Sequence, residues 1–120
     1  MELELKDKVK KAVKAYMHHM RDVEFLDEVN DFLIFEEEGE VVVFVAVSAE
    51  IGSFPRVSRN RLRNEFEDAM ITWFSEPENR DKVDFPIRCD SAEVNIMGKD
   101  RALVRHVVNA FGSGDYHDWH

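Results

Sequence analysis

Cysteine is nearly missing from this sequence, which has Cys89 alone among 120 residues. A single cysteine cannot close a disulfide within the chain, and it leaves no Cys-X-X-Cys pair for zinc or redox chemistry. Long apolar runs are missing too, since no stretch reaches the roughly 18 apolar residues of a membrane-spanning helix. The first eleven residues mix acids with lysines and contain no apolar segment. We therefore expect a cytoplasmic protein that is neither secreted nor inserted into a membrane.

Positive charge is also scarce. Sixteen Lys and Arg stand against 25 Asp and Glu, which gives a net charge of -9. Such a charge opposes indiscriminate binding to nucleic acid or to an acidic membrane, so any site for a polyanion must be local. The sequence has no Gly-rich phosphate-binding loop. It also supports no Ser-His-Asp or Cys-His set, because Cys89 lies in an apolar segment that indicates a structural role.

What is present suits one domain. Hydrophobic residues make up 44% of the chain, enough to bury a single core at this length. Apolar residues spaced three and four apart predict a helix over about residues 3–20 and a second helix from an N-cap at Ser58 to about Phe74. Between them, the β-branched run 41–49 predicts a central strand that is buried on both faces. We place one domain at 1–111 and a C-terminal tail at 112–120.

The remaining strands are predicted from shorter apolar runs. A strand is expected to begin at Val23, another to cover 32–35, and a long strand with a possible bulge to cover 85–97, after a polar loop at 76–81. Residues 102–108 fit a helix or a strand, and we favour a strand. The order αβββαββ predicts an α/β fold with a mixed central sheet flanked by helices.

Several short segments also occur together in an order that is typical of one family. They are Ala15-Tyr16-Met17, Asp31-Phe32-Leu33-Ile34, the acidic turn at Gly39, Val43 to Ser48, the Arg-rich stretch around Leu62, Arg88-Cys89-Asp90, Leu103 to His106 and Asn109-Ala110-Phe111. Together they resemble the YraN-like family, small cytoplasmic proteins of the restriction-endonuclease-like fold that are related to Holliday junction resolvases. The resemblance covers roughly residues 8–111 and implies that fold.

The resemblance further implies a nuclease motif, of which this sequence keeps one part. Family nucleases have an Asp and then a Glu-X-Lys at the end of the following strand, where carboxylates hold Mg²⁺ beside the scissile phosphate and the lysine orients the attacking water. Asp31 matches the Asp, but Ala46 and Ser48 stand at the Glu and Lys positions. Glu50 is two positions further along the same face and is the acid that could replace the missing one. Asp31 is thus the one candidate metal ligand left, although an acid at this place also suits the plain start of a strand.

A second candidate site is a cluster of positive charge. Within eight residues that contain no acid, the chain has Arg56, Arg59, Arg61 and Arg63, which we call the arginine segment. Such a cluster could contact phosphates, and arginines in a first helical turn oppose the helix dipole. The alternative is a solvated helix face on which Arg61 pairs with Glu65 and Arg63 with Glu67.

The histidines give weaker signals. His18 and His19 diverge on a helix, because neighbouring residues are separated by about 100°. His106 is alone in an apolar segment, which indicates a hydrogen-bonded core or edge histidine rather than a ligand. In the tail, the residues that could chelate a divalent ion are Asp115, His117, Asp118 and His120.

These observations support one leading hypothesis and two alternatives. The leading hypothesis is a non-catalytic nuclease-fold protein that binds nucleic acid weakly through the arginine segment and needs no cofactor. The first alternative is an active Mg²⁺-dependent DNA endonuclease that uses Asp31 and a displaced acid such as Glu50. The second is a protein-binding module, which the acidic charge and large apolar residues such as Trp73, Phe74 and Trp119 would favour. The nature of the nucleic acid or protein partner and the oligomeric state stay open.

Overall fold

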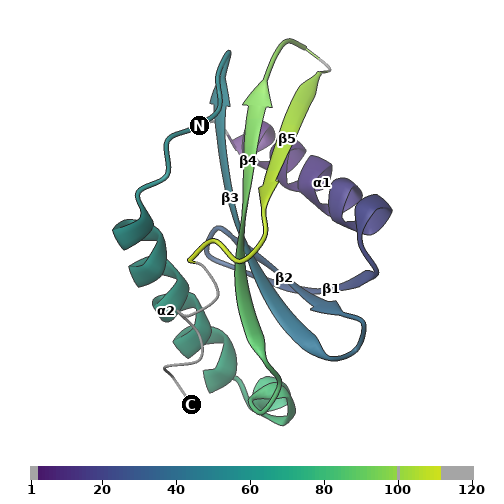
Figure 1. The fold of residues 1–120 in the computed structure, drawn as a ribbon, viewed down its shortest axis with the longest axis vertical. Helices are drawn as coiled ribbons and strands as arrows, with labels where there is room; N and C mark the ends of the chain where they lie inside the picture. The colour runs from purple at the N-terminus through teal and green to yellow at the C-terminus, as the bar shows by residue number, and fades with distance from the viewer. Residues whose placement is uncertain (1–2, 100, 112–120) are drawn as a thin grey trace.

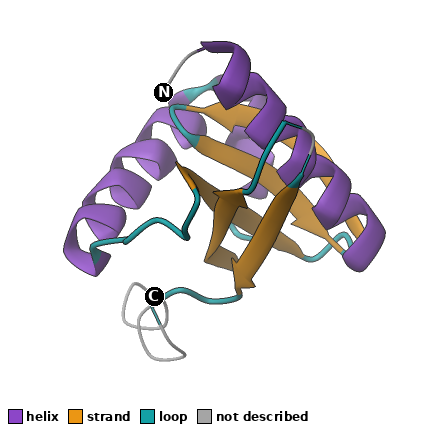
Figure 2. Ribbon diagram, turned by 90° about the horizontal axis from the view of Figure 1, so that it is seen from above, coloured by secondary structure: helices purple, strands orange, loops and turns teal. Residues whose placement is uncertain are grey.

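A five-stranded mixed sheet with one α-helix on each face forms the fold, as Figures 1 and 2 show. This computed structural model describes residues 3–99 and 101–111. Its elements are α1 (Leu3–Met20), β1 (Val23–Val29), β2 (Phe32–Glu37), β3 (Val41–Ile51), α2 (Arg59–Ser75), the 3₁₀ helix η1 (Pro77–Lys82), β4 (Ile87–Ile96) and β5 (Ala102–Val107). The α/β class and the mixed sheet predicted from the sequence are confirmed. The tail predicted at 112–120 lies outside the described residues.

The strands follow one another across the sheet in chain order. β1, β2 and β3 form an antiparallel meander, β4 runs parallel to β3, and β5 returns antiparallel to β4. A parallel pair needs a crossover connection, which α2 supplies. β3 is thus the central strand. Burial on both faces was predicted for 41–49 and is confirmed for residues 42–45, whereas Val41 and residues 46–49 are only partly buried.

Alternation along β3 divides the core into two layers. Phe44 packs toward α2 with Phe66 and Trp73, whereas the neighbouring Val43 and Val45 pack toward α1. On α1, the buried stripe consists of Val9, Val13 and Met17. Each helix therefore covers one face because its apolar stripe meets one set of alternating strand residues.

The start of α2 is fixed by its cap. Ser58 has an extended backbone, and its Oγ accepts a hydrogen bond from the Arg61 amide at 3.3 Å. The Ser58 carbonyl accepts the Leu62 amide at 2.9 Å, which closes the first helical turn. The predicted N-cap is confirmed, and it sets where the arginine segment enters the helix.

Two local predictions were wrong. The segment expected to be a polar loop forms η1, because Pro77 suits a first helical turn and the Asn79 side chain donates to the Trp73 carbonyl at 2.9 Å. β4 pairs with both neighbours in continuous register, so it has no bulge. The register shift lies instead in β1, between Phe25 and Asp27. An edge strand tolerates such a shift more easily than a strand bonded on both sides.

The edge strand β5 settles one ambiguity, and α2 buries an aromatic side chain that the protein-binding alternative would need at the surface. Residues 102–107 form a strand, as we favoured, and leave Leu103 and Val107 exposed. Trp73, which the protein-binding alternative would need at the surface, is 2% exposed and donates from its indole nitrogen to Asp27 at 3.0 Å. Phe74 is half-buried against the same core, and Trp119 lies outside the described residues. In the part of the chain described, no helix is both long and apolar enough to cross a bilayer.

Candidate functional site

A cleft lies where α2 begins, between the N-terminal turn of this helix and the strands β3 and β4. We call it the α2 cleft; its volume is about 310 Å³. Its wall includes the three positions of the expected nuclease motif and two residues of the arginine segment, namely Asp31, Ala46, Ser48, Arg56 and Arg61. Two separate predictions from the sequence thus meet in one hollow.

Small side chains create the hollow. Ala46 and Ser48 lie two apart on β3 and face the same side of the sheet, as alternation predicts. On β4, Ser91 is in register with Ala46 and continues the same floor. Longer side chains at these three positions would fill the space between the sheet and the first turn of α2.

Two hydroxyl groups on the floor have no hydrogen-bond partner among the described residues. They are Ser48 Oγ and Ser91 Oγ, and both atoms are shielded from solvent. Ser91 as a whole is 3% exposed. A buried hydroxyl without a partner costs about 1–3 kcal/mol, so these two groups mark a place where a bound polar group would stabilise the protein.

Asp31 lies at the rim rather than the floor. It occupies the turn between β1 and β2, where its side chain is exposed and its carbonyl accepts the Val47 amide at 3.1 Å. Asp31 lines the α2 cleft and also a smaller hollow of about 230 Å³ on the α1 side, together with Lys6 and Lys10. Asp31 therefore borders hollows on both faces of the sheet.

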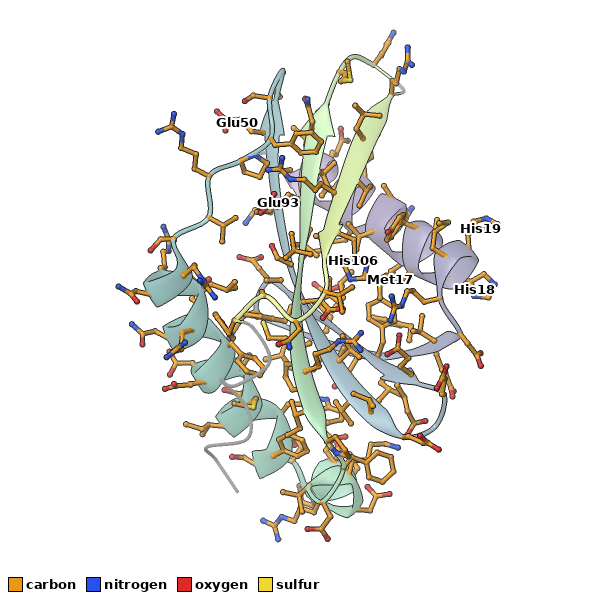
Figure 3. All side chains as sticks on the ribbon, viewed as in Figure 1. Met17, His18, His19, Glu50, Glu93 and His106 are labelled. Atoms are coloured by element: carbon orange, nitrogen blue, oxygen red, sulfur yellow. The ribbon has the colours of Figure 1, made fainter. Side chains whose placement is uncertain are left out.

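An acid at the cleft, besides Asp31, comes from α2 and not from β3. Glu50 is exposed near the end of β3 and is not part of the cleft wall (Figure 3). Glu65 on α2 does line the cleft, and it accepts a hydrogen bond from Arg61 at 2.7 Å. Glu93 is in register with Ser48 on β4, but Arg105 holds it at 2.7 Å. Sequence reasoning missed Glu65, because only the tertiary fold brings it opposite Asp31.

The arginine segment divides over two sides of α2. Arg56 is exposed at the cleft, where Arg61 joins it with its Glu65 pair. Arg59 instead donates to the Ala110 carbonyl at 3.3 Å, and the Arg63 guanidinium lies 5.1 Å from the centre of the Phe111 ring. The four charges therefore form a pair at the cleft and a pair against the segment that follows β5.

Metal ligands do not gather in the described part of the chain. Within residues 3–99 and 101–111, no three His, Cys, Asp or Glu side chains are close enough together to hold an ion. His18 and His19 are exposed at the end of α1, with ring centres 6.1 Å apart (Figure 3). The possible chelating residues of the tail, from Asp115 to His120, lie outside the described residues.

A buried polar network lies on the opposite face, beneath α1. Its centre is Asp90, which is fully buried and accepts hydrogen bonds from Arg88 at 2.7 and 2.9 Å, His106 at 2.8 Å and the Asn109 amide at 2.9 Å. Arg88 also donates to Glu37 at 2.6 Å. The expectation of a hydrogen-bonded core histidine at His106 is confirmed. We call these residues the Asp90 network, and their role is to join β2, β4 and β5.

Hydrogen bonds and charge in this network lower the pKa values of two carboxyl groups, those of Asp90 and Glu37. Burial alone would raise the pKa of Asp90, but the hydrogen bonds from His106 and Arg88 outweigh burial and hold the pKa below its ordinary value of 3.8. In the same way, hydrogen bonds from Arg88 and Arg21 hold the pKa of Glu37 below 4.5 despite its burial. Burial also raises the pKa of the Cys89 thiol far above its ordinary value, which makes it a poor nucleophile.

The molecule has a larger hollow, of about 410 Å³, between the first half of α1 and the turn from β4 to β5. Its floor is apolar and includes Leu5 and Ile96, and its rim has the cations Lys8, Lys99 and Arg101. Unlike the α2 cleft, it contains no residue that sequence analysis singled out. None of its lining groups is an orphaned buried hydroxyl.

Comparison with models of known protein families finds no match for this chain. A search of curated proteins likewise finds no significant match.

Proposed function

We propose that this chain is a non-catalytic protein of the restriction-endonuclease-like fold, similar to the YraN-like family, that binds nucleic acid weakly at the α2 cleft. One observation carries the proposal: the cleft combines Asp31, Ala46 and Ser48 with two cations of the arginine segment. A phosphodiester placed there would meet positive charge beside positions that in the resembled nucleases act on phosphate. The meander followed by a parallel strand across a helix also supports the proposed fold.

Loss of catalysis follows from the side chains at two positions. A methyl group at Ala46 and a hydroxyl at Ser48 supply neither a metal carboxylate nor an ammonium group for orienting water. The remaining acids at the cleft are Asp31 and Glu65, of which Glu65 is already paired with Arg61. Charge also limits affinity, since the chain as a whole is acidic.

The presence of Glu65 opposite Asp31 favours one alternative strongly enough to be tested beside the proposal. In that alternative the chain is a Mg²⁺-dependent endonuclease whose second carboxylate comes from α2. Freeing Glu65 from Arg61 would be needed before it could ligate an ion. The two candidate functions therefore differ in whether bound nucleic acid is cut.

Incubation with branched, duplex and single-stranded DNA, with and without Mg²⁺ or Mn²⁺, tests both. We expect weak binding that is unaffected by chelation, and no cleavage of any substrate, because the charge balance for a catalytic ion is missing. Dose-dependent cleavage that disappears in both Asp31→Ala and Glu65→Ala would establish the endonuclease instead. Failure to bind any of the three DNAs at low salt would favour a protein-binding module.

A further inference from the structure

We infer that the α2 cleft is a seat for one phosphoryl group, held by the first amides of α2, the Arg56 guanidinium and the Ser91 hydroxyl. This inference deepens the proposed function, on which it rests for nucleic acid as the source of the phosphate. It assigns the ligand chemistry and the protein donors, neither of which the proposed function requires.

The first donors are backbone amides. In any α-helix the first turn leaves amide groups without a carbonyl partner inside the helix. In α2, Ser58 takes the Arg61 and Leu62 amides through its hydroxyl and carbonyl oxygens. The amides of Arg59 and Asn60 are left, and the helix dipole adds partial positive charge at this end. Because Ser58 itself lines the cleft, this helix end borders the hollow.

The independent sign of a ligand is the floor of the cleft. Ser91 alternates on β4 with Asp90 and Ala92, which belong to the α1 face, so its side chain lies on the α2 face. Ser91 is only 3% exposed, yet its Oγ has no hydrogen-bond partner among the described residues. Ser48 is only partly buried, but its Oγ atom is also shielded and has no hydrogen-bond partner among the described residues. Each hydroxyl carries a hydrogen that a phosphoryl oxygen is able to accept.

The charges around the cleft fit a single phosphoryl group and oppose a larger anionic ligand. Arg56 is exposed at the rim, and the Arg61 charge is shared with Glu65 at 2.7 Å. Asp31 at the opposite rim repels a second negative group. The volume of about 310 Å³ accommodates one tetrahedral phosphate with its hydration.

Inorganic phosphate is the probe for the direct test, observed by amide NMR of the full chain at constant ionic strength and in the presence of EDTA. We expect saturable shifts at the amides of Arg59, Asn60 and Ser91, and none with chloride. Ser91→Ala should weaken phosphate about tenfold, since a hydrogen bond to a charged group is lost. Ser53→Ala, in the exposed loop after β3, is the matched control and should bind as the wild type does.

A second variant guards against a folding defect at Ser91. Glu65→Gln removes the carboxylate that holds Arg61, so phosphate should bind about threefold more tightly, a gain that a misfolded protein would not show. Glu78→Gln, exposed on η1, makes the same charge change away from the cleft and should leave phosphate affinity unchanged. Equal affinities in Ser91→Ala and Ser53→Ala, or in Glu65→Gln and Glu78→Gln, would overturn the seat.

Binding of oligonucleotides with and without a 5′-phosphate identifies the source of the phosphate. The same measurements distinguish a failure of the phosphoryl site from a failure of the proposed function. A preference for a 5′-phosphorylated strand over its unphosphorylated twin, lost in Ser91→Ala, supports the seat with a terminal phosphate. Equal binding of the two strands, weakened in Ser91→Ala, supports it with a backbone phosphate. DNA binding that ignores Ser91→Ala overturns the seat and leaves the proposed function standing. Saturable phosphate shifts without DNA binding uphold the seat and overturn the proposed function.

Discussion

Two neighbouring residues of β4, Asp90 and Ser91, differ in how far their polar groups are hydrogen-bonded. Asp90 has every acceptor direction engaged by Arg88, His106 and the Asn109 amide. The hydroxyl group of Ser91, one residue later and on the other face, has no hydrogen-bond partner among the described residues. Asp90 is therefore a structural group, whereas Ser91 is a candidate ligand group. The structural role of Asp90 can be tested by measuring the stability of a variant.

Replacing Asp90 by alanine should lower the free energy of unfolding by about 3–5 kcal/mol, because Arg88 would keep a buried charge without its main partner. Urea denaturation of the variant and the wild type measures this. Glu28→Ala breaks the outer ion pair with Lys10 and serves as a control, with an expected loss of about 0–1 kcal/mol. Similar losses in the two variants would show that the Asp90 network does not hold the strands together.

Acid should destabilise the protein through the same residues. The folded-state pKa values of Asp90 and Glu37 lie below their ordinary values of 3.8 and 4.5. The stability that these groups contribute is therefore present above those ordinary values and is lost as the pH falls through the folded-state pKa values. Unfolding free energies measured from about pH 6 to about pH 3 should fall, and the fall should be smaller in Asp90→Asn. An equal fall in both proteins would place the acid sensitivity elsewhere.

Among the elements, β3 decides both the fold and the site. Its two faces meet different helices, and its second half supplies the cleft floor at Ala46 and Ser48. If this strand keeps the geometry of the resembled nucleases, a carboxylate and an ammonium group introduced at these two positions should stand side by side near Asp31.

The double variant Ala46→Glu/Ser48→Lys tests that geometry. Without metal it should lose about 1–3 kcal/mol of stability, because the introduced carboxylate is partly desolvated and repelled by Asp31. Mg²⁺ or Mn²⁺ should restore part of the loss by binding only the folded state. Thermal melts of the variant and the wild type, each with and without the ion, measure the effect. A variant whose melting temperature ignores metal would show that the positions do not converge with Asp31.

How far sequence analysis reached also differs from element to element. The stripes of α1 and α2, the Ser58 cap and the buried run of β3 were predictable because each depends on residues close together in the chain. The 3₁₀ helix and the register shift in β1 were not, since one depends on the Asn79 bond to Trp73 and the other on how an edge strand adapts to its neighbour. Local patterns contain the first kind of information and not the second.

At the scale of the whole molecule, the cleft combines elements that the sequence keeps far apart. Asp31, the small residues of β3 and the arginine segment were each identifiable, but Ser91 and Glu65 became candidates only when β4 and α2 lay beside them. The same assembly turns Arg59 and Arg63 toward the segment after β5 and leaves Arg56 and Arg61 at the cleft. An acidic molecule thus has two cations at the place where it is proposed to meet phosphate.

The salt dependence of DNA binding by cleft variants tests this central claim most directly. Fluorescence anisotropy with labelled DNA at several salt concentrations gives the affinity and the slope of log affinity against log salt. If one phosphate is neutralised at the cleft, the slope for duplex DNA should be about -1, and Arg56→Ala/Arg61→Ala should bring it close to zero. Lys11→Ala/Arg80→Ala removes the same charge from exposed positions outside the cleft and should leave the slope nearly unchanged. Equal effects of the two double variants would contradict binding at the α2 cleft.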